Sequence, residues 1–524
     1  MNTSALSRRP DLILHNARVL TLDEGQPAAS LVAVRGDRIV LIASEESLNG
    51  LALRGANVID CRGQTLIPGF IDAHCHILAY ASSLLAVDCG PREASSIDDI
   101  KLALSKRATA TPSGQWIRAT GYEELELAER HHPSRRDLDE AAPHHPARLT
   151  HRSGHACVLN SMALARVGIG RDTPDPPTGV IEREEGTGEP TGLLLEMDEY
   201  LDRLIPRLGE RDLEAGIELA SRRMLSLGIT SVQDATRSNS PERWDTLSRL
   251  KANGSFGPRI TMMAGSDHLE QFLNRGLRSD TGDLDLSMGA VKIMLTMTTG
   301  SPQPTFEELL ATVRRARDAG FQVAVHAVER EAVEAAVSAL TYGAAGADTS
   351  ASHSMMRDRI EHCSECPPDA LRRLAGSGIV IVSQPGFLYY SGRRYLSEVA
   401  KDLQPWLYRF GSFMRAGIPL AAGSDAPVIE PNPLVGIYAA VTRRSDAGEV
   451  VGDGEAVSAD EALRMYTINA AYAAFQEADR GSLEVGKLAD LVLLDRDPTR
   501  VEAGLIAETK VTMTVVGGRI VWPS

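Results

Sequence analysis

Two histidines separated by one residue close an apolar run in LIPGFIDAHCHILAY, residues 66–80. Side chains at i and i+2 of a strand point to the same face, so His74 and His76 can converge on one metal ion while Cys75 faces away. Two polar histidines that merely end a strand would show the same pattern. The motif alone therefore leaves both interpretations open, and the ends of the other apolar runs must decide between them.

Three further polar residues close apolar runs later in the chain. FQVAVHA carries His326, DRIEHC carries His362, and IPLAAGSDA carries Asp425. Any one of them alone would more often be a buried core residue or a helix cap. Imidazole and carboxylate groups are common zinc ligands, and their repeated arrival at strand ends favours a metal site.

Lys292 interrupts the apolar stretch GAVKIMLT. A buried lysine is costly unless it is paired, neutralised or chemically altered. Reaction with carbon dioxide would convert its amine into a carboxylate that can bridge two cations. The alternative is a lysine that reaches the surface or pairs with a carboxylate.

These residues belong to a repeating alternation of short buried strands and amphipathic helices such as TFEELLATVRRARDAG and PDALRRLAGSG. Strand followed by helix, eight times over, is typical of a (β/α)₈ TIM barrel. The strand candidates are TLIPGFIDAH, GITSVQDA, PRITMMAG, GAVKIMLT, FQVAVHA, DRIEHC, IVIVSQP and IPLAAGSDA.

Two regions fall outside this alternation. Short strands with turns occupy both chain ends, which predicts a discontinuous small β-sandwich domain built from residues 1–62 and 480–524, since isolated hairpins are marginal alone. The barrel is expected over 63–479. Residues 80–225 hold further strand-like pieces and the loop RDTPDPPTG, so we expect a large insertion subdomain after barrel strand 1, at the end of the barrel where loops carry selectivity.

The composition of the chain limits the classes of partner that the protein is expected to bind. The chain has 55 basic and 70 acidic side chains, a net charge of -15, and no basic run, which argues against nucleic acid. No segment approaches the roughly 20 apolar residues of a membrane span. Six cysteines in 524 residues favour a reducing compartment. We expect a cytoplasmic enzyme that acts on a small-molecule substrate, with no nucleic-acid or membrane partner, and that forms a homo-oligomer, most simply a dimer.

The ordered series PGFIDAHCH, VKI, VAVHA, RIEHC and AGSDAP, closed by GSLEVGKLADLVLLDRDP, resembles the metal-dependent amidohydrolase superfamily. SGHACVLNS and GITSVQDA are similar to its amidohydrolase 3 branch, which includes N-substituted formamide deformylases. The resemblance implies one or two divalent ions, usually zinc, at the carboxyl ends of the barrel strands. In a binuclear centre, His74 and His76 would bind the more buried ion, His326 and His362 the more exposed ion, and a carboxylated Lys292 would bridge them.

The resemblance also implies two catalytic residues. Asp425 would touch the buried ion and accept a proton from the attacking water, which is a usual role for a positioned carboxylate. His155, in HRSGHACVLNS, would hydrogen-bond the scissile carbonyl or a tetrahedral oxyanion. A structural histidine inside the insertion is the alternative for His155.

Substrate contacts are harder to predict. Relatives often carry an Asp shortly after the VKI motif, whereas this chain continues MLTMTTGSPQP, so contacts from this loop cannot be copied. Aromatic residues near expected loops could form a pocket or simply pack. The candidates are Tyr122, Thr296, Phe387 and Tyr389, with Tyr390 and Trp406 nearby.

The expected function is metal-dependent hydrolysis of a non-peptide C–N bond in an amide, formamide, carbamate or related compound. A mononuclear deaminase or decarboxylase on the same fold is the first alternative, and an unmodified Lys292 would favour it. A barrel that has lost its chemistry and serves as an assembly protein is an alternative from another class. Such a protein should have lost some of its metal-binding residues. Here all six predicted positions hold residue types that can bind a metal ion.

Overall fold

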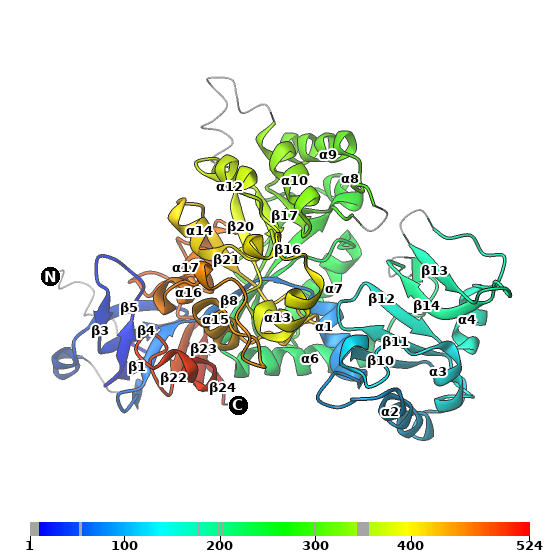
Figure 1. Ribbon diagram of the computed structural model, residues 1–524. Helices are drawn as coiled ribbons and strands as arrows, with labels where there is room; N and C mark the ends of the chain where they lie inside the picture. Colours follow the sequence, from blue (N-terminus) through cyan, green and yellow to red (C-terminus); the bar gives the residue numbers. More distant parts are fainter. Residues whose placement is uncertain are drawn as a thin grey trace.

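The computed structural model describes residues 10–51, 55–176, 179–197, 200–201, 203–297, 300–342 and 356–523. Eight parallel strands form one sheet that curls into a barrel near the middle of the molecule (Figure 1). The predicted barrel is thereby confirmed, with the strand candidates in their expected order. Of the first candidate, TLIPGFIDAH, only the part from Phe70 onward is in the barrel, because Thr65–Pro68 pairs with Leu491–Leu494 in another sheet. The strands are β8 (Phe70–Cys75), β15 (Ile229–Asp234), β16 (Arg259–Gly265), β17 (Leu286–Met294), β18 (Val323–Ala327), β19 (Arg359–His362), β20 (Val380–Ser383) and β21 (Leu420–Ala422).

The first and last barrel strands meet at their carboxyl ends. The Asp425 amide donates to the His74 carbonyl at 2.7 Å, and the His76 amide donates to the Ala426 carbonyl at 2.9 Å. Gly423 is needed at this seam, because a Cβ there would lie 2.5 Å from the His74 nitrogen. The seam brings the HxH motif and Asp425 together.

Small apolar side chains fill part of the barrel interior. Ala235, Met263, Ala290 and Ala324 form a separate buried cluster. Ala290 and Ala324 lie two residues before Lys292 and His326, so each pair shares one face of its strand. The small residues leave room for the longer polar side chains next to them.

Amphipathic helices surround the barrel. α9 starts with a capping box in which Thr305 and Glu308 bond each other's backbone amides, and its acidic first turn and basic last turn suit the helix dipole. The helices of the barrel region are α1 (Ile77–Leu85), α6 (Glu210–Ser226), α7 (Pro241–Ala252), α8 (Leu269–Asn274), α9 (Phe306–Asp318), α10 (Arg330–Thr341), α12 (Pro368–Leu374), α13 (Gly386–Glu398), α14 (Phe410–Arg415), α15 (Pro433–Thr442), α16 (Ala459–Met465) and α17 (Ile468–Tyr472), with 3₁₀ turns η4 (Ser266–His268), η5 (Gln404–Trp406), η6 (Asp453–Glu455) and η7 (Ala503–Glu508).

Strands from the first 70 and the last 35 residues of the chain share a sheet (Figure 1). β7 pairs with β22, with Thr65 opposite Leu494 and Pro68 opposite Leu491. One sheet has the order β24-β23-β22-β7-β2-β3 and the other β5-β4-β1-β6. Their elements are β1 (Leu12–His15), β2 (Arg18–Leu20), β3 (Ala28–Ala29), β4 (Leu31–Arg35), β5 (Arg38–Ala43), η2 (Glu45–Gly50), β6 (Asn57–Asp60), β7 (Thr65–Pro68), β22 (Leu491–Leu494), β23 (Val511–Val516) and β24 (Arg519–Trp522).

Between α1 and α6 the chain forms a further six-stranded sheet, drawn in cyan beside the barrel (Figure 1). The strand order is β13-β14-β12-β11-β10-β9, with β9, β10 and β11 parallel and the rest antiparallel. Its elements are β9 (Val87–Asp88), α2 (Ile97–Thr109), β10 (Ile117–Tyr122), η3 (Glu124–Glu126), α3 (Arg135–Ala141), β11 (Ala147–His151), β12 (Ala156–Leu159), α4 (Ser161–Val167), β13 (Val180–Arg183) and β14 (Pro190–Leu195).

In the described parts of the chain, none of the helices combines the length and apolar character that crossing a bilayer would need.

Candidate metal centre

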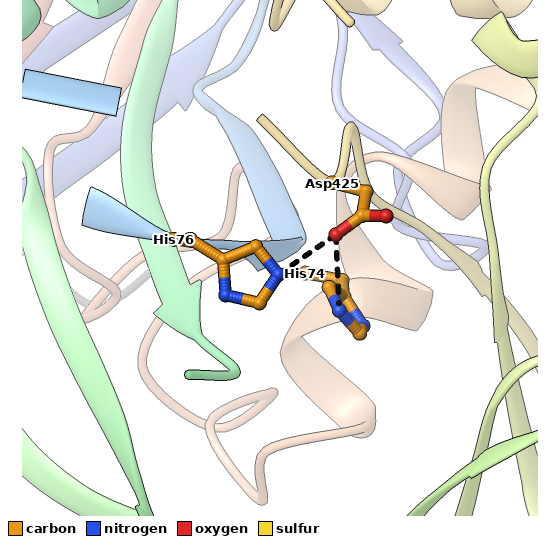
Figure 2. Close-up of side chains that lie close together, drawn as sticks. All are labelled: His74, His76 and Asp425. Atoms are coloured by element: carbon orange, nitrogen blue, oxygen red, sulfur yellow. Dashed lines mark hydrogen bonds and ion pairs between the residues drawn. The ribbon is translucent and has the colours of Figure 1, made fainter. Parts of the chain in front are cut away.

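Three side chains meet at the seam between β8 and β21 (Figure 2). Asp425 Oδ1 lies 2.8 Å from His76 Nε2 and 3.4 Å from His74 Nε2. His74 is buried and His76 is partly exposed. Two imidazole nitrogens around one carboxylate oxygen is a donor set suited to zinc and similar divalent ions.

His326 and His362 extend this cluster from β18 and β19. The His362 ring centroid lies 4.8 Å from that of His74 and 4.4 Å from that of His326. His362 Nδ1 is 2.7 Å from Gln384 Oε1, which fixes the orientation of the ring. The four predicted histidines therefore stand in one connected group.

Lys292 is a buried residue near the carboxyl end of β17. The residue is 2% exposed, and its Nζ has no hydrogen-bond partner among the described residues. Burial lowers the pKa of Lys292 to about 8, against the attraction of Glu361 and Asp425. A buried amine without a hydrogen-bond partner is unfavourable in free energy, so a further group that binds this atom is expected beside it.

Glu361 is a supporting residue that the sequence analysis did not identify. Its Oε2 lies 2.5 Å from His74 Nδ1, and both carboxylate oxygens accept hydrogen bonds from Arg359, at 2.7 and 3.0 Å. Arg359 also bonds Gln233 and the Ala73 carbonyl. A carboxylate behind a metal-binding histidine fixes its tautomer. The sequence feature that could have identified Glu361 is the presence of two charged residues in the short buried strand RIEH.

Asp72 holds the turn that carries Asp425. Ser424 donates to Asp72 through its hydroxyl at 2.5 Å and its amide at 2.9 Å. Asp425 and His362 both have left-handed backbones, with φ of 60° and 69°. Such conformations are uncommon outside glycine and often occur at functional sites.

Electrostatics set the charge states in the cluster. Burial would raise the pKa of Asp425, but the hydrogen bond with His76 and the nearby His74 hold it well below its ordinary value. Burial lowers the pKa of His362 to about 4 and that of His326 well below 6.5. His326 and His362 are therefore neutral and Asp425 is charged at neutral pH, the forms in which these groups bind metals.

His155 stands in the turn between β11 and β12. Its Nδ1 lies 2.9 Å from Glu196 Oε1, and its side chain is 47% exposed. Its charge contributes to the lowered pKa of His326. The structure therefore places His155 at the edge of the insertion sheet beside Glu196, a residue that was not identified from the sequence.

The predicted substrate contacts lie in different places. The Phe387 ring stacks on the His362 ring at 6.5 Å, directly beside the ligand cluster. Tyr389 packs against Tyr390 and Tyr438, farther along α13. Thr296 pairs with Gln303 through two backbone hydrogen bonds. Thr298 and Thr299, in the same loop, lie outside the described residues.

Tyr122 lies in the core of the insertion. Its side chain is fully buried, and its hydroxyl is 3.0 Å from His132 Nδ1. A second acidic and histidine group surrounds it, made of Glu123, Glu124 and His151. Arg152 and Arg394 contact Glu123, at 3.5 and 3.3 Å. This group is therefore an ion-pair network, and the two arginines oppose a cation there.

The described residues contain two groups with metal-binding potential, and only the barrel group combines a carboxylate, several neutral imidazoles and a buried amine without a partner. The imidazole and carboxylate groups of the barrel cluster, and the Lys292 amine without a hydrogen-bond partner, are compatible with a bound divalent ion. Residues 57–522 match the model of the amidohydrolase family. The chain belongs to the amidohydrolase family. This membership agrees with the motif series that runs from the HxH pair to Asp425.

Known relatives of this amidohydrolase span its whole length. The chain is 33% identical to an N-substituted formamide deformylase of Arthrobacter pascens, over 98% of both chains. It is 29% identical to protein LONG AFTER FAR-RED 3 of Arabidopsis thaliana, covering 98% of this chain and 92% of the relative. A solved structure of an uncharacterised metal-dependent hydrolase from Pyrococcus horikoshii shares its fold, with a TM-score of 0.75, 23% identity, and coverage of 94% and 99%.

Proposed function

We propose that this amidohydrolase is a metal-dependent hydrolase of non-peptide C–N bonds, and that N-substituted formamides are its substrate class. One observation carries the proposal: His74, His76 and Asp425 converge at the seam of a barrel that also holds the buried Lys292 amine, whose charge is attracted by Asp425. The formamide class is suggested by the deformylase relative, which matches over the full chain.

The proposed ligands are the residues of the barrel cluster. His74, His76 and Asp425 would hold one ion, and His326 with His362 a second. Zinc suits this imidazole and carboxylate set. Carbon dioxide would add to the Lys292 amine as a carbamate, with loss of a proton, which would satisfy the buried nitrogen and supply a bridging carboxylate.

A bound divalent ion would polarise the substrate carbonyl and lower the pKa of water toward neutrality. Asp425 is ionised, and its Oδ1 faces the two imidazoles, so its other oxygen accepts the proton of the attacking water. The C–N bond of the formamide breaks as this proton passes to nitrogen. Water and R–NH–CHO become formate and R–NH₃⁺, and both water protons end on nitrogen.

Several finer features belong to the same proposal. The two sheets at the chain ends would pack as one β-sandwich domain, and the six-stranded insertion would carry substrate selectivity, with Phe387, Tyr389, Thr296 and Tyr122 as candidate contacts. A cytoplasmic homodimer is the expected form. Light scattering of the purified chain tests the dimer.

The first test measures metal content and hydrolysis together. Zinc-reconstituted protein should release formate and amine in equal amounts from N-butylformamide or N-(2-phenylethyl)formamide. His74→Ala should lose bound metal, and Asp425→Ala should lose about 10²–10⁴-fold in turnover, while both keep the circular dichroism of the folded protein. Zinc-edge anomalous diffraction gives the number of ions.

Cys75→Ala is the matched control, because Cys75 lies between the two histidines and packs in the helical core. It should keep its metal and its turnover. Unchanged turnover in both His74→Ala and Asp425→Ala would contradict the mechanism. Lysine carboxylation is tested separately: ¹³C-bicarbonate should give a carbamate carbon signal that Lys292→Arg abolishes.

A further inference from the structure

Thr236 lies two residues beyond β15, a barrel strand that supplies none of the predicted metal ligands. Its Oγ1 lies 3.1 Å from His76 Nδ1. The other ring nitrogen of His76, Nε2, lies 2.8 Å from Asp425 Oδ1, on the side of the candidate metal centre. The ring of His76 is therefore contacted by a carboxylate at Nε2 and by a hydroxyl at Nδ1.

His74 has the same arrangement with a different partner. Its Nε2 lies 3.4 Å from Asp425 Oδ1, and its Nδ1 lies 2.5 Å from Glu361 Oε2. A metal-binding histidine usually donates the N–H of its second ring nitrogen to a supporting group, which fixes the tautomer and the orientation of the ring. Thr236 therefore has the same position relative to His76 that Glu361 has relative to His74.

The main chain on both sides of this contact is held by one buried carboxylate, that of Asp234. Asp234 Oδ1 accepts a hydrogen bond from the Thr236 amide at 3.0 Å and another from the Asn239 side chain at 2.9 Å. Asp234 Oδ2 accepts one from the Ile77 amide at 2.9 Å. Because Ile77 directly follows His76, the carboxylate fixes the position of Thr236 relative to the histidine.

Asn239 attaches the turn that contains Thr236 to the neighbouring strand β16. Its side chain is buried and donates to the Met263 carbonyl at 3.0 Å. Its own carbonyl accepts from the Gly265 amide at 3.1 Å, and a Cβ at Gly265 would lie 2.8 Å from that carbonyl oxygen. A shift of the turn would leave these buried polar groups without partners, which is costly.

A hydroxyl suits this place because it can either donate or accept a hydrogen bond. With the His76 proton on Nε2, facing Asp425, the Thr236 hydroxyl donates to Nδ1. With the proton on Nδ1, the hydroxyl accepts, and the lone pair of Nε2 is available to a cation. The His76 ring can therefore keep one orientation in both tautomers.

We propose that Thr236 is a positioning residue, which holds the His76 ring through Nδ1 so that Nε2 faces the metal centre both before and after an ion binds. The proposal rests on the proposed function, because it assigns a role at the same metal centre. In this role Thr236 acts through His76.

Zinc affinity tests the role of the hydroxyl. Thr236→Val should weaken zinc binding by about 10-fold in competition with a chelator, and Thr236→Ser should restore most of the affinity. Thr230→Val is the matched control, because Thr230 lies in β15 but its hydroxyl donates to the Phe70 carbonyl, at 3.3 Å. It should keep the zinc affinity of the wild type. Wild-type affinity in Thr236→Val, or an equal loss in Thr230→Val, would overturn the proposal.

A crystal structure of the metal-free protein gives a measurement that depends neither on zinc nor on turnover. The His76 ring should have one orientation in the wild type and in Thr236→Ser, and more than one in Thr236→Val. An unchanged ring in Thr236→Val would overturn the proposal. Wild-type protein that binds no zinc, or that releases no formate, contradicts the proposed function instead, and the ring orientation still decides whether Thr236 holds His76.

Discussion

The proposed metal ligand His74 is oriented by buried charged side chains behind it. His74 is held by Glu361, whose charge is matched by the buried Arg359. Outer contacts of this kind orient a ligand and raise its basicity, and their loss commonly costs 10–100-fold in metal affinity. The orientation of the proposed ligand His74 in β8 therefore depends on two residues of a second strand, β19.

We expect Glu361→Gln to weaken zinc binding by about 10–100-fold, measured by competition with a chelator. Since Arg359 would then be a buried charge without its counter-ion, the free energy of unfolding should also fall by about 3–5 kcal/mol. Glu365→Gln is the control, because this carboxylate contacts the Arg330 amide and not His74. Zinc affinity equal to the wild type in Glu361→Gln would show that the carboxylate plays no part in the ligand geometry.

The sequence predicts residues of unusual type at strand ends more easily than it predicts their supports. His74, His326 and Asp425 stand out because each follows an apolar run. The contact of His74 with Glu361 joins positions 287 residues apart, and that of His155 with Glu196 depends on how the insertion folds. Such pairs become visible only when the strands are placed side by side.

At the scale of elements, the parallel strands β10 and β11 end next to each other. A β-bulge after Thr120 shifts the register so that Tyr122 pairs with His151, and Glu124 at the start of η3 lies 2.9 Å from His151 Nε2. The contact with His151 lowers the pKa of Glu124 from 4.5 to about 2. Burial opposes the charged form of His151, but its contacts with Glu123 and Glu124 outweigh burial and raise its pKa above 6.5.

These shifts predict how stability depends on pH. The contribution of the Glu124 carboxylate to the free energy of unfolding is complete above pH 4.5. It is lost as the pH falls toward 2, because the pKa of Glu124 is lowered in the folded protein. The contribution of His151 is complete below pH 6.5 and is lost as the pH rises through its raised folded pKa. The difference in urea midpoint between wild type and Glu124→Gln should therefore be largest between these limits and shrink on both sides.

Glu126→Gln is the control for this series, because Glu126 lies on the same short helix and contacts Arg393 only at 3.8 Å. Its difference from the wild type should stay small at every pH. A Glu124→Gln effect that does not vary with pH would mean that the pair is not ionised as described.

Periodicity was sufficient to predict the barrel elements, because buried parallel strands and amphipathic helices have distinct patterns. The fold of the insertion was harder to predict from the sequence. Its strands could be found, but the order β13-β14-β12-β11-β10-β9 mixes parallel and antiparallel neighbours, which local patterns do not encode. The pairing of β7 with β22 likewise joins segments from opposite ends of the chain.

At the scale of the whole molecule, a buried ion pair ties the barrel to the chain ends. Arg259 at the start of β16 bonds Asp490 at 2.8 and 3.1 Å, just before β22. Asp490 also accepts from the Gly517 amide at 2.8 Å and so connects to the turn between β23 and β24. The barrel and the sheet that contains both chain ends are therefore expected to unfold together.

We expect Asp490→Asn to lower the free energy of unfolding by about 3–5 kcal/mol, measured by urea denaturation, because it leaves a buried guanidinium uncompensated. Asp285→Asn is the control, since Asp285 bonds the same Arg259 at 2.6 Å but is 61% exposed. Its effect should be at most about 1 kcal/mol. Equal effects of the two substitutions would contradict a structural role for burial of this pair.

The attachment of the insertion has a consequence for the evolution of this enzyme. The chain enters the insertion from α1 and returns through α6, and these two helices touch so closely that a Cβ on Gly216 would lie 2.6 Å from the Ala81 carbonyl. The entry and exit points of the insertion are therefore neighbours at one side of the barrel. We expect that the whole unit could be exchanged between related enzymes as a cassette, which would give a new surface to an otherwise unaltered barrel.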